Sequence, residues 1–178
     1  MDAKKQLELL NHSRHDWMNV LQIIKGNITL ERYEKVEEIV EKTIQKKEHE
    51  SRLTRLQMPK TAAFLLTFNW YSRMFTLDIE VTENTGSCTV YDNDWNYLIT
   101  TFLHTLDRSV LPGADNQLLI TIHTLEKPFL EFDFLGEIEK LEEINNWLYA
   151  FSSSSNHCFV TNVVCNEKEI FFTAWNNK

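Results

Sequence analysis

The sequence predicts an α+β protein in which an N-terminal helical hairpin, a four-helix bundle in the dimer, precedes a C-terminal α/β sandwich. The hairpin is predicted because apolar residues recur at helical spacing along two long stretches before residue 56. The sandwich is predicted because short alternating apolar runs interleave with amphipathic segments after residue 60. A chain of 178 residues can form two small domains. We therefore expect a hairpin domain at 1–56 and an α/β domain at 60–178.

The first helix is expected from about Asp2 to Glu31, and the second from a turn near Arg32 and Tyr33 to about Leu53. Apolar residues at three- and four-residue spacing define one side of each helix. They are Leu7, Leu10, Trp17, Leu21, Ile24 and Ile28 in the first helix, and Tyr33, Val36, Ile39, Val40 and Ile44 in the second. A single hairpin cannot bury so wide an apolar surface, whereas two hairpins can form a four-helix bundle. The sequence therefore predicts a homodimer.

Pro59 is expected to end the hairpin, because proline cannot continue a helix. A third helix is predicted from a cap at Thr61 to about Met74. Alternation over residues 77–81 predicts a strand, followed by a turn at 84–86 and a short second strand at 88–91 that pairs with it.

Asp92 or Asn93 is expected to cap the next helix, which ends before Pro112. Alternating apolar residues then predict strands at 118–122 and 129–134. A helix from about Gly136 to Phe151 and a loop at 152–156 follow. Strands at 159–164 and 170–175 are expected to close the domain as a hairpin.

Composition excludes several classes of function. The formal net charge of −8 argues against binding DNA or RNA, although an acidic protein can still dock a basic patch on a partner protein. The three cysteines, Cys88, Cys158 and Cys165, lack metal-ligand spacing and are expected to be reduced thiols in core or strand positions. The N-terminus is expected to open an amphipathic helix rather than a signal peptide, and no apolar run approaches a membrane span. These features predict a cytoplasmic protein.

One polar stripe on the first helix centres on His15. At about 100° per residue, Lys4, Glu8, Asn11, Asn19 and Gln22 fall within about 40° of it. The apolar residues of the helix cluster around the opposite pole. We therefore expect the His15 imidazole to be exposed on a rigid helix, where it suits chemistry on a large partner rather than in a pocket.

The residues around His15 suit phosphoryl transfer. Histidine as a residue type supplies a neutral nitrogen at cellular pH, and the transfer depends on in-line positioning and charge neutralisation. Asp16 is expected to hold the Nδ1–H so that Nε2 presents its lone pair, and Asn19 to bond phosphoryl oxygens. Arg14 and Lys25 can offset anionic charge. An ordinary surface histidine is the alternative that helix geometry leaves open.

Other chemistries fit less well. His12 and His15 lie at i and i+3, but two nitrogens without a third ligand make a poor zinc site. Helix-end, core or strand positions are expected for the remaining histidines, His49, His104, His123 and His157. No serine or cysteine lies in a nucleophile-elbow sequence.

The first helix carries a family resemblance. The run from His12 through Asn19, with residues 21–27, resembles the sporulation initiation phosphotransferase family of the phosphorelay in endospore-forming bacteria. Residues 48–53 and 66–70 resemble the same family, and the similarity is clearest over residues 7–82. The stretch from Arg14 to Asn19 also resembles the R-H-[DE]-x-x-N phosphoacceptor box of certain sensor histidine kinases.

The resemblance implies a dimeric phosphotransferase with two active histidines. Phosphate passes from the aspartate of a single-domain response regulator to the histidine matching His15. It then passes to the aspartate of a second response regulator, a transcription factor that controls sporulation. The response regulator supplies Mg²⁺. We expect it to be recognised by the surface around His15, which consists of Asn11, Arg14, Met18, Asn19, Gln22 and Gly26.

The C-terminal domain resembles the ATP-binding domain of histidine kinases in the order of its elements, but it departs from the working form. Where the kinases carry paired asparagines, the matching helix has Thr101, His104 and Thr105. Residues 133–136 are a remnant of the D-x-G-x-G box, and the four glycines of the chain cannot build a glycine-rich lid. We expect no bound ATP. The alternatives are an ATP-dependent histidine kinase fragment and a non-catalytic module that binds response regulators.

Overall fold

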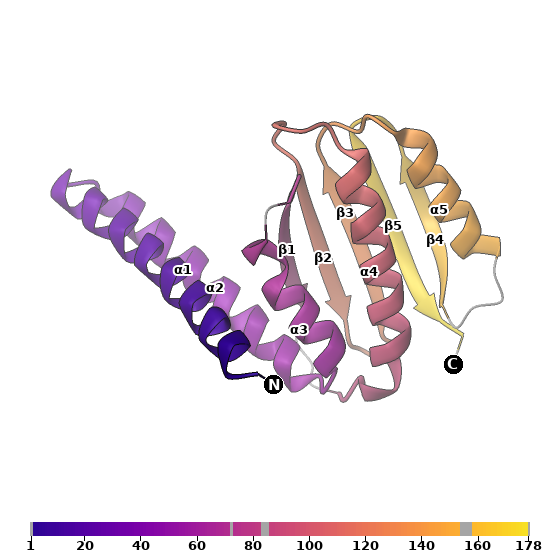
Figure 1. The fold of residues 1–178 in the computed structure, drawn as a ribbon, viewed down its shortest axis with the longest axis horizontal. Helices are drawn as coiled ribbons and strands as arrows, with labels where there is room; N and C mark the ends of the chain where they lie inside the picture. Colours follow the sequence, from indigo (N-terminus) through magenta and orange to yellow (C-terminus); the bar gives the residue numbers. More distant parts are fainter. Residues whose placement is uncertain (1, 72, 83–85, 154–157, 178) are drawn as a thin grey trace. The chain divides into compact units, whose positions relative to one another are not determined.

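A computed structural model describes residues 2–71, 73–82, 86–153 and 158–177, and the chain divides into two compact units, 1–48 and 49–178. The N-terminal unit is built from α1 (Ala3–Thr29) and most of α2 (Tyr33–Arg55), which run antiparallel (Figure 1). Lys47 of α2 lies 5.7 Å from the ring centroid of Trp17 on α1. Because α2 passes from one unit into the other, the predicted domain limits of 1–56 and 60–178 stay predictions.

A tight turn joins the two helices. The N–H of Leu30 donates to the carbonyl of Gly26, and the N–H of Arg32 donates to the carbonyl of Asn27. Glu31 adopts a left-handed conformation with φ of 55°, which reverses the chain direction. The first helix therefore ends two residues before the Glu31 limit predicted from the sequence.

The C-terminal unit is a mixed sheet with helices on one face (Figure 1). Its helices are α3 (Pro59–Thr67), α4 (Asp92–Ser109) and α5 (Leu141–Ser153), with short 3₁₀ turns η1 (Phe68–Trp70) and η2 (Thr89–Tyr91). Its strands are β1 (Thr76–Val81), β2 (Gln117–His123), β3 (Phe129–Leu135), β4 (Cys158–Cys165) and β5 (Glu169–Asn176). The strand order is β1-β2-β3-β5-β4, and only the β1–β2 pair is parallel among the pairs described.

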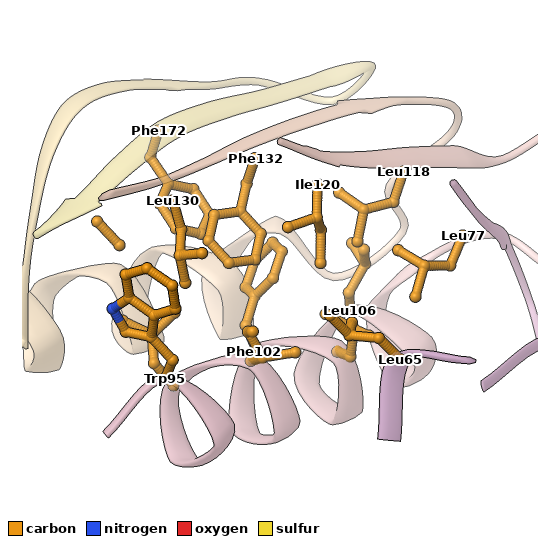
Figure 2. Close-up of a cluster of buried hydrophobic side chains, with 14 of the residues drawn as sticks. Leu65, Leu77, Trp95, Phe102, Leu106, Leu118, Ile120, Leu130, Phe132 and Phe172 are labelled. Atoms are coloured by element: carbon orange, nitrogen blue, oxygen red, sulfur yellow. The ribbon is translucent and has the colours of Figure 1, made fainter. Parts of the chain in front are cut away.

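The core lies between this sheet and the helices (Figure 2). Alternate residues of each strand point toward the helices, as the two-residue period of a strand requires. Phe102 of α4 is fully buried, with its ring centroid 5.3 Å from that of Phe132 and 4.8 Å from that of Phe172. Burying each such side chain contributes about 1.5–3 kcal/mol, so this cluster fixes α4 against the sheet.

Two predicted elements differ because of hydrogen bonds that the local sequence pattern does not reveal. The third helix ends at Thr67 rather than near Met74, since the amide of Asn69 pairs with the N–H and carbonyl of Leu77 at 3.0 and 2.7 Å. The second strand expected at 88–91 is wrong, because the N–H of Cys88 donates to the Leu56 carbonyl and a 3₁₀ turn follows. The turn expected at 84–86 lies largely outside the described residues.

The start predicted for the last helix is also wrong. Residues 136–140 are not helical, and Ile138 forms an isolated antiparallel bridge with Val110. The N–H of Gly136 donates to the Lys168 carbonyl, so backbone pairing competes with helix formation until Leu141. In the loop expected at 152–156, residues 152 and 153 belong to α5, and residues 154–156 lie outside the described residues.

The N-terminus of α3 is capped from a distant part of the chain. The Asp92 carboxylate accepts hydrogen bonds from the N–H groups of Lys60 at 3.1 Å and Thr61 at 2.9 Å. The predicted cap at Thr61 is wrong, since this residue lies within α3. The predicted cap of α4 at Asp92 or Asn93 is also wrong, because α4 already begins at Asp92.

The predicted fold class is confirmed: a helical hairpin precedes a C-terminal unit of five strands and packed helices. The four-helix bundle stays a prediction. Within the part of the chain that the structure describes, no helix combines the length and apolar character needed to cross a membrane.

Candidate functional site

His15 lies midway along α1, with 73% of its side chain exposed. The neighbouring Asp16 side chain is 58% exposed. Nothing in the helix screens the imidazole, so a large partner can reach it directly. The site is therefore a surface feature of a rigid element.

Two polar side chains lie near the Nδ1 atom of His15. The amide nitrogen of Asn19, one turn further along α1, lies 3.3 Å from Nδ1. A carboxylate oxygen of Asp16 lies 3.8 Å from the same atom, which is longer than a hydrogen bond. Asn19 therefore lies closer to Nδ1 than Asp16 does, although Asp16 was the residue expected from the sequence to hold Nδ1–H.

The Asn19 contact bears on which ring nitrogen carries the proton. An asparagine amide presents either its oxygen or its nitrogen after a half-turn of the side chain. In the structure the amide nitrogen faces Nδ1, so an N–H donated to Nδ1 leaves the ring proton on Nε2. After the half-turn, the amide oxygen accepts a hydrogen bond from Nδ1–H, and Nε2 keeps the lone pair that a nucleophile needs.

The other predicted surface residues lie along the exposed side of α1. Asn11, Met18, Gln22 and Gly26 are exposed, with Met18 at 53%. The guanidinium of Arg14 donates to the side-chain oxygen of Asn11, which directs its charge toward the preceding turn. A Cβ added at Gly26 would have no neighbouring atom within 4 Å, so the surface is open there.

The apolar side of the hairpin is left partly uncovered in the single chain. Leu10, Trp17 and Leu21 are 58%, 47% and 54% exposed, although the sequence pattern marks them as interface positions. Exposed apolar residues gathered on one side of a helix indicate a partner surface. The exposed apolar side chains of the hairpin therefore favour packing against further helices.

Acidic and basic side chains pair along α2. Glu38 accepts hydrogen bonds from Lys35 at 2.6 Å and from Lys42 at 2.8 Å. The hydrogen bond from Lys35, supported by that from Lys42, lowers the pKa of the Glu38 carboxyl to about 2. The same pairing raises the pKa of Lys42.

Two of the remaining histidines take part in the fold. His49 accepts a hydrogen bond at Nδ1 from the Val81 N–H at 3.0 Å, and His123 of β2 stacks on Phe129 at 4.1 Å. The helix-end, core or strand position expected for His104 is wrong, because this residue is exposed within α4, and His157 lies outside the described residues. Among the residues that the structure describes, no three histidine, cysteine or acidic side chains gather as metal ligands.

The three cysteines are thiols that form no disulfide. Cys88 and Cys158 are buried and Cys165 is half-buried, as expected for core and strand positions. Burial raises the pKa of the Cys88 and Cys165 thiols, which keeps them protonated and weakly nucleophilic.

Two of the residues expected at the positions of the kinase asparagines, Thr101 and Thr105, form hydrogen bonds within the C-terminal unit. The Thr101 hydroxyl accepts a hydrogen bond from the Trp147 indole N–H at 3.2 Å and donates to the Tyr97 carbonyl at 2.9 Å. The Thr105 hydroxyl donates to the Thr101 carbonyl at 2.9 Å. These hydroxyls are occupied within the helical layer.

The comparisons with known proteins agree with this arrangement. Residues 1–56 match the family model described as "Sensor kinase SpoOB-type, alpha-helical domain". Residues 57–174 match the model "Sporulation initiation phospho-transferase B, C-terminal". The chain therefore belongs to the sporulation initiation phosphotransferase B family, and the resemblance seen in the sequence is confirmed.

One curated relative is sporulation initiation phosphotransferase B of Bacillus subtilis strain 168, with 39% identity over 118 residues. The match covers 66% of this chain and 62% of that relative, so it spans less than two thirds of the relative's length. Among solved structures, the histidine kinase domain of a blue-light activated kinase from Erythrobacter litoralis EL346 matches with a TM-score of 0.39 and 7% identity. That match covers 65% of this chain and 57% of the other, and we draw no functional conclusion from it.

Proposed function

We propose that this protein is a phosphorelay histidine phosphotransferase whose phosphoacceptor is His15. The observation that carries the proposal is the exposed imidazole with Asn19 at its Nδ1. The curated relative is named a phosphotransferase of sporulation initiation, which supports a role in such a relay.

The proposed chemistry has two balanced half-reactions. The Nε2 lone pair attacks the phosphorus of an aspartyl phosphate on a first response regulator. As the Nε2–phosphorus bond forms, the bond to the carboxylate oxygen breaks and its electron pair stays on that oxygen. In the second half-reaction, the carboxylate of a second response regulator, a transcription factor, attacks the phosphohistidine and restores the imidazole.

Residues around His15 are given distinct roles in this proposal. Asn19 fixes the ring through Nδ1, and Asp16 offsets positive charge on the ring during transfer. Arg14 offsets phosphoryl charge at the rim of the site. The open surface at Asn11, Met18, Gln22 and Gly26 receives the response regulator, which brings the Mg²⁺ ion and the acidic pocket that holds it.

The functional unit is proposed to be a cytoplasmic homodimer. Two hairpins that pair through Leu10, Trp17, Leu21 and their neighbours would cover the apolar surface that one chain leaves exposed. Burial of apolar area contributes about 25 cal/mol per Å² before entropic costs. The two copies of His15 would then lie on the outside of the bundle.

We also propose that the C-terminal unit does not use ATP. The hydroxyls of Thr101 and Thr105 are engaged in the helical layer, and Gly136 is needed for packing, since a Cβ there would collide with the Asn116 side chain. The phosphate would then enter only from a partner protein.

The test is a transfer assay with the intact protein. Incubation with a single-domain response regulator carrying labelled aspartyl phosphate should label this chain with an acid-labile, base-stable bond. Incubation with labelled Mg-ATP alone should leave it unlabelled. Labelling by ATP would point to a kinase, and a stable complex without any labelled chain would point to a non-catalytic binding module.

A further inference from the structure

The sheet of the C-terminal unit has a second face that its own helices leave uncovered. Leu118, Ile120, Phe132 and Phe172 point from the strands toward the helices (Figure 2). The intervening residues project to the other side, because side chains alternate along a strand. We name this side the open face. Its side chains are Thr76, Asp78 and Glu80 on β1, Gln117, Leu119, Thr121 and His123 on β2, Phe129, Glu131, Asp133 and Leu135 on β3, Glu169, Phe171, Thr173 and Trp175 on β5, and Phe159, Thr161 and Val164 on β4.

An aromatic row crosses one end of the open face. His123, Phe129, Trp175 and Phe159 are paired in register on four neighbouring strands. Ring centroids of His123 and Phe129 lie 4.1 Å apart, and those of Phe129 and Trp175 lie 4.3 Å apart, both stacked. With strands spaced about 4.8 Å apart, the row is about 14 Å long.

Acidic side chains lie next to the aromatic row on the open face, two on β1 and two on β3. Asp78 and Glu80 lie on β1, and Glu131 and Asp133 lie on β3, at register positions next to one another across β2. Glu131 is two residues from Phe129, or about 7 Å along the strand. No lysine or arginine occupies an open-face position on the described strands.

The net negative charge of the chain lies in the C-terminal unit, which carries the open face. Residues 1–48 contain nine lysines and arginines and nine aspartates and glutamates, so they are formally neutral. The net charge of −8 therefore belongs entirely to residues 49–178. Such a unit attracts cationic partners and repels anionic ones over about a Debye length, 8–10 Å at physiological salt.

We propose that the open face is a docking surface for a cationic amphipathic helix of a partner protein. Apolar side chains of that helix would lie on the aromatic row, and its lysines or arginines would reach Glu80 and Glu131 in the next row. About three helical turns match the length of the row, since each residue rises 1.5 Å. A nucleic acid or a second copy of the same acidic face would be repelled.

This inference goes beyond the proposed transfer at His15 and does not depend on it. The docked helix gives the C-terminal unit a binding role of its own, whichever chemistry the hairpin performs. A partner held there would be captured by a surface with no part in the phosphoryl transfer.

The experiment uses the whole 178-residue chain and a synthetic helical peptide of about eighteen residues, long enough to form a helix. The peptide places leucine and alanine on one side and lysine on the other. Two control peptides carry the same residues in scrambled order or glutamate in place of lysine. Binding is measured by titration at low and physiological salt, and the site is mapped by NMR shifts of strand amides.

Matched variants decide whether the carboxylates of the open face bind the peptide. The double variant E80Q/E131Q removes the two charges that the docked helix would reach, whereas E142Q/E143Q removes two from exposed positions at the start of α5. Because an exposed ion pair contributes only modestly to binding, the first variant should weaken binding about five-fold and the second less than two-fold. F129T should weaken binding further, and thermal melting would confirm that it is folded.

The supporting result is binding of the lysine peptide alone, with shifts centred on β2, β3 and β5 and lost in E80Q/E131Q. Equal binding of the scrambled peptide, or equal loss in both double variants, would show only general attraction to an acidic protein and overturn the proposal. Shifts confined to the helices would overturn it too. So would the absence of binding at millimolar peptide, as expected if the chain's own hairpin or a second copy covers the face.

Discussion

The carboxylate of Asp92 should be among the largest single polar contributions to the stability of the C-terminal unit. It is 7% exposed, and it accepts the N–H groups of Lys60 and Thr61 at the first turn of α3. In D92A, the N–H of the fully buried Thr61 loses its acceptor without access to water, which costs about 2 kcal/mol. The partly exposed N–H of Lys60 adds about 1 kcal/mol. We therefore expect D92A to lower the free energy of unfolding by about 3 kcal/mol.

Two further variants separate the hydrogen bonds from the side chain itself. D92N keeps one acceptor oxygen but loses the charge that favours a helix N-terminus, so it should cost about 1–2 kcal/mol. N93A removes only an exposed bond to the Lys60 ammonium and should cost less than about 0.5 kcal/mol.

The assay is urea-induced unfolding of the full chain, followed by tryptophan fluorescence at a fixed protomer concentration. With a slope of about 2 kcal/mol per molar urea, D92A should lower the midpoint by about 1.5 M. The reasoning is refuted if D92A unfolds within 0.3 M of the parent, or if N93A loses as much as D92A.

Three shorter predictions concern the hairpin. L21E should convert a dimer of about twice the 21.1 kDa chain mass into a monomer, because it places a charge in the apolar interface, and light scattering would report this. The pKa of the Glu38 carboxyl, followed by NMR, should be about 2 and should rise toward its usual 4.5 in K35Q or in high salt. Because the pKa is lowered in the folded protein, the small stabilising effect of Glu38 is present above pH 4.5 and is lost as the pH falls through 2. The same Glu38 titration in K35Q and the parent would contradict this. N19A should slow phosphoryl transfer several-fold and shift the His15 ring toward the Nε2–H tautomer, as read from ring nitrogen NMR shifts. The same tautomer ratio in N19A and the parent would show that Asn19 does not orient the ring.

The elements that the sequence predicted well are those with strong local periodicity. The alternation of Leu118, Ile120 and Ile122 predicted β2, and the three- and four-residue spacing of apolar residues around Trp17 predicted α1. Each pattern gives its element one apolar face, and this does not depend on distant parts of the chain. The position of His15 on an exposed stripe follows from the same helical period, and its 73% exposure agrees. Local pattern was sufficient for these features.

The errors arose where distant residues decide the structure. Asp92 caps a helix that begins 33 residues earlier at Pro59, and no local pattern reveals that bond. Asn69 ends the third helix by pairing with Leu77, whereas its neighbours are apolar enough to continue a helix. Ile138 forms a β-bridge with Val110, so residues 136–140 are not helical although their sequence allows a helical turn. Each outcome depends on a tertiary contact.

The central claim is that His15 carries the phosphoryl group, and one pair of variants tests it most directly. H15Q removes the nucleophile and leaves a side chain of similar size on an exposed helix position, so the dimer should persist. H12Q is the matched control, since His12 lies about 60° around the helix from His15. Each variant is mixed with the labelled response regulator, and the label on this chain and its passage to the second regulator are measured. Our account predicts that H15Q is never labelled and blocks both half-transfers while H12Q retains most of the transfer; label on H15Q would contradict it.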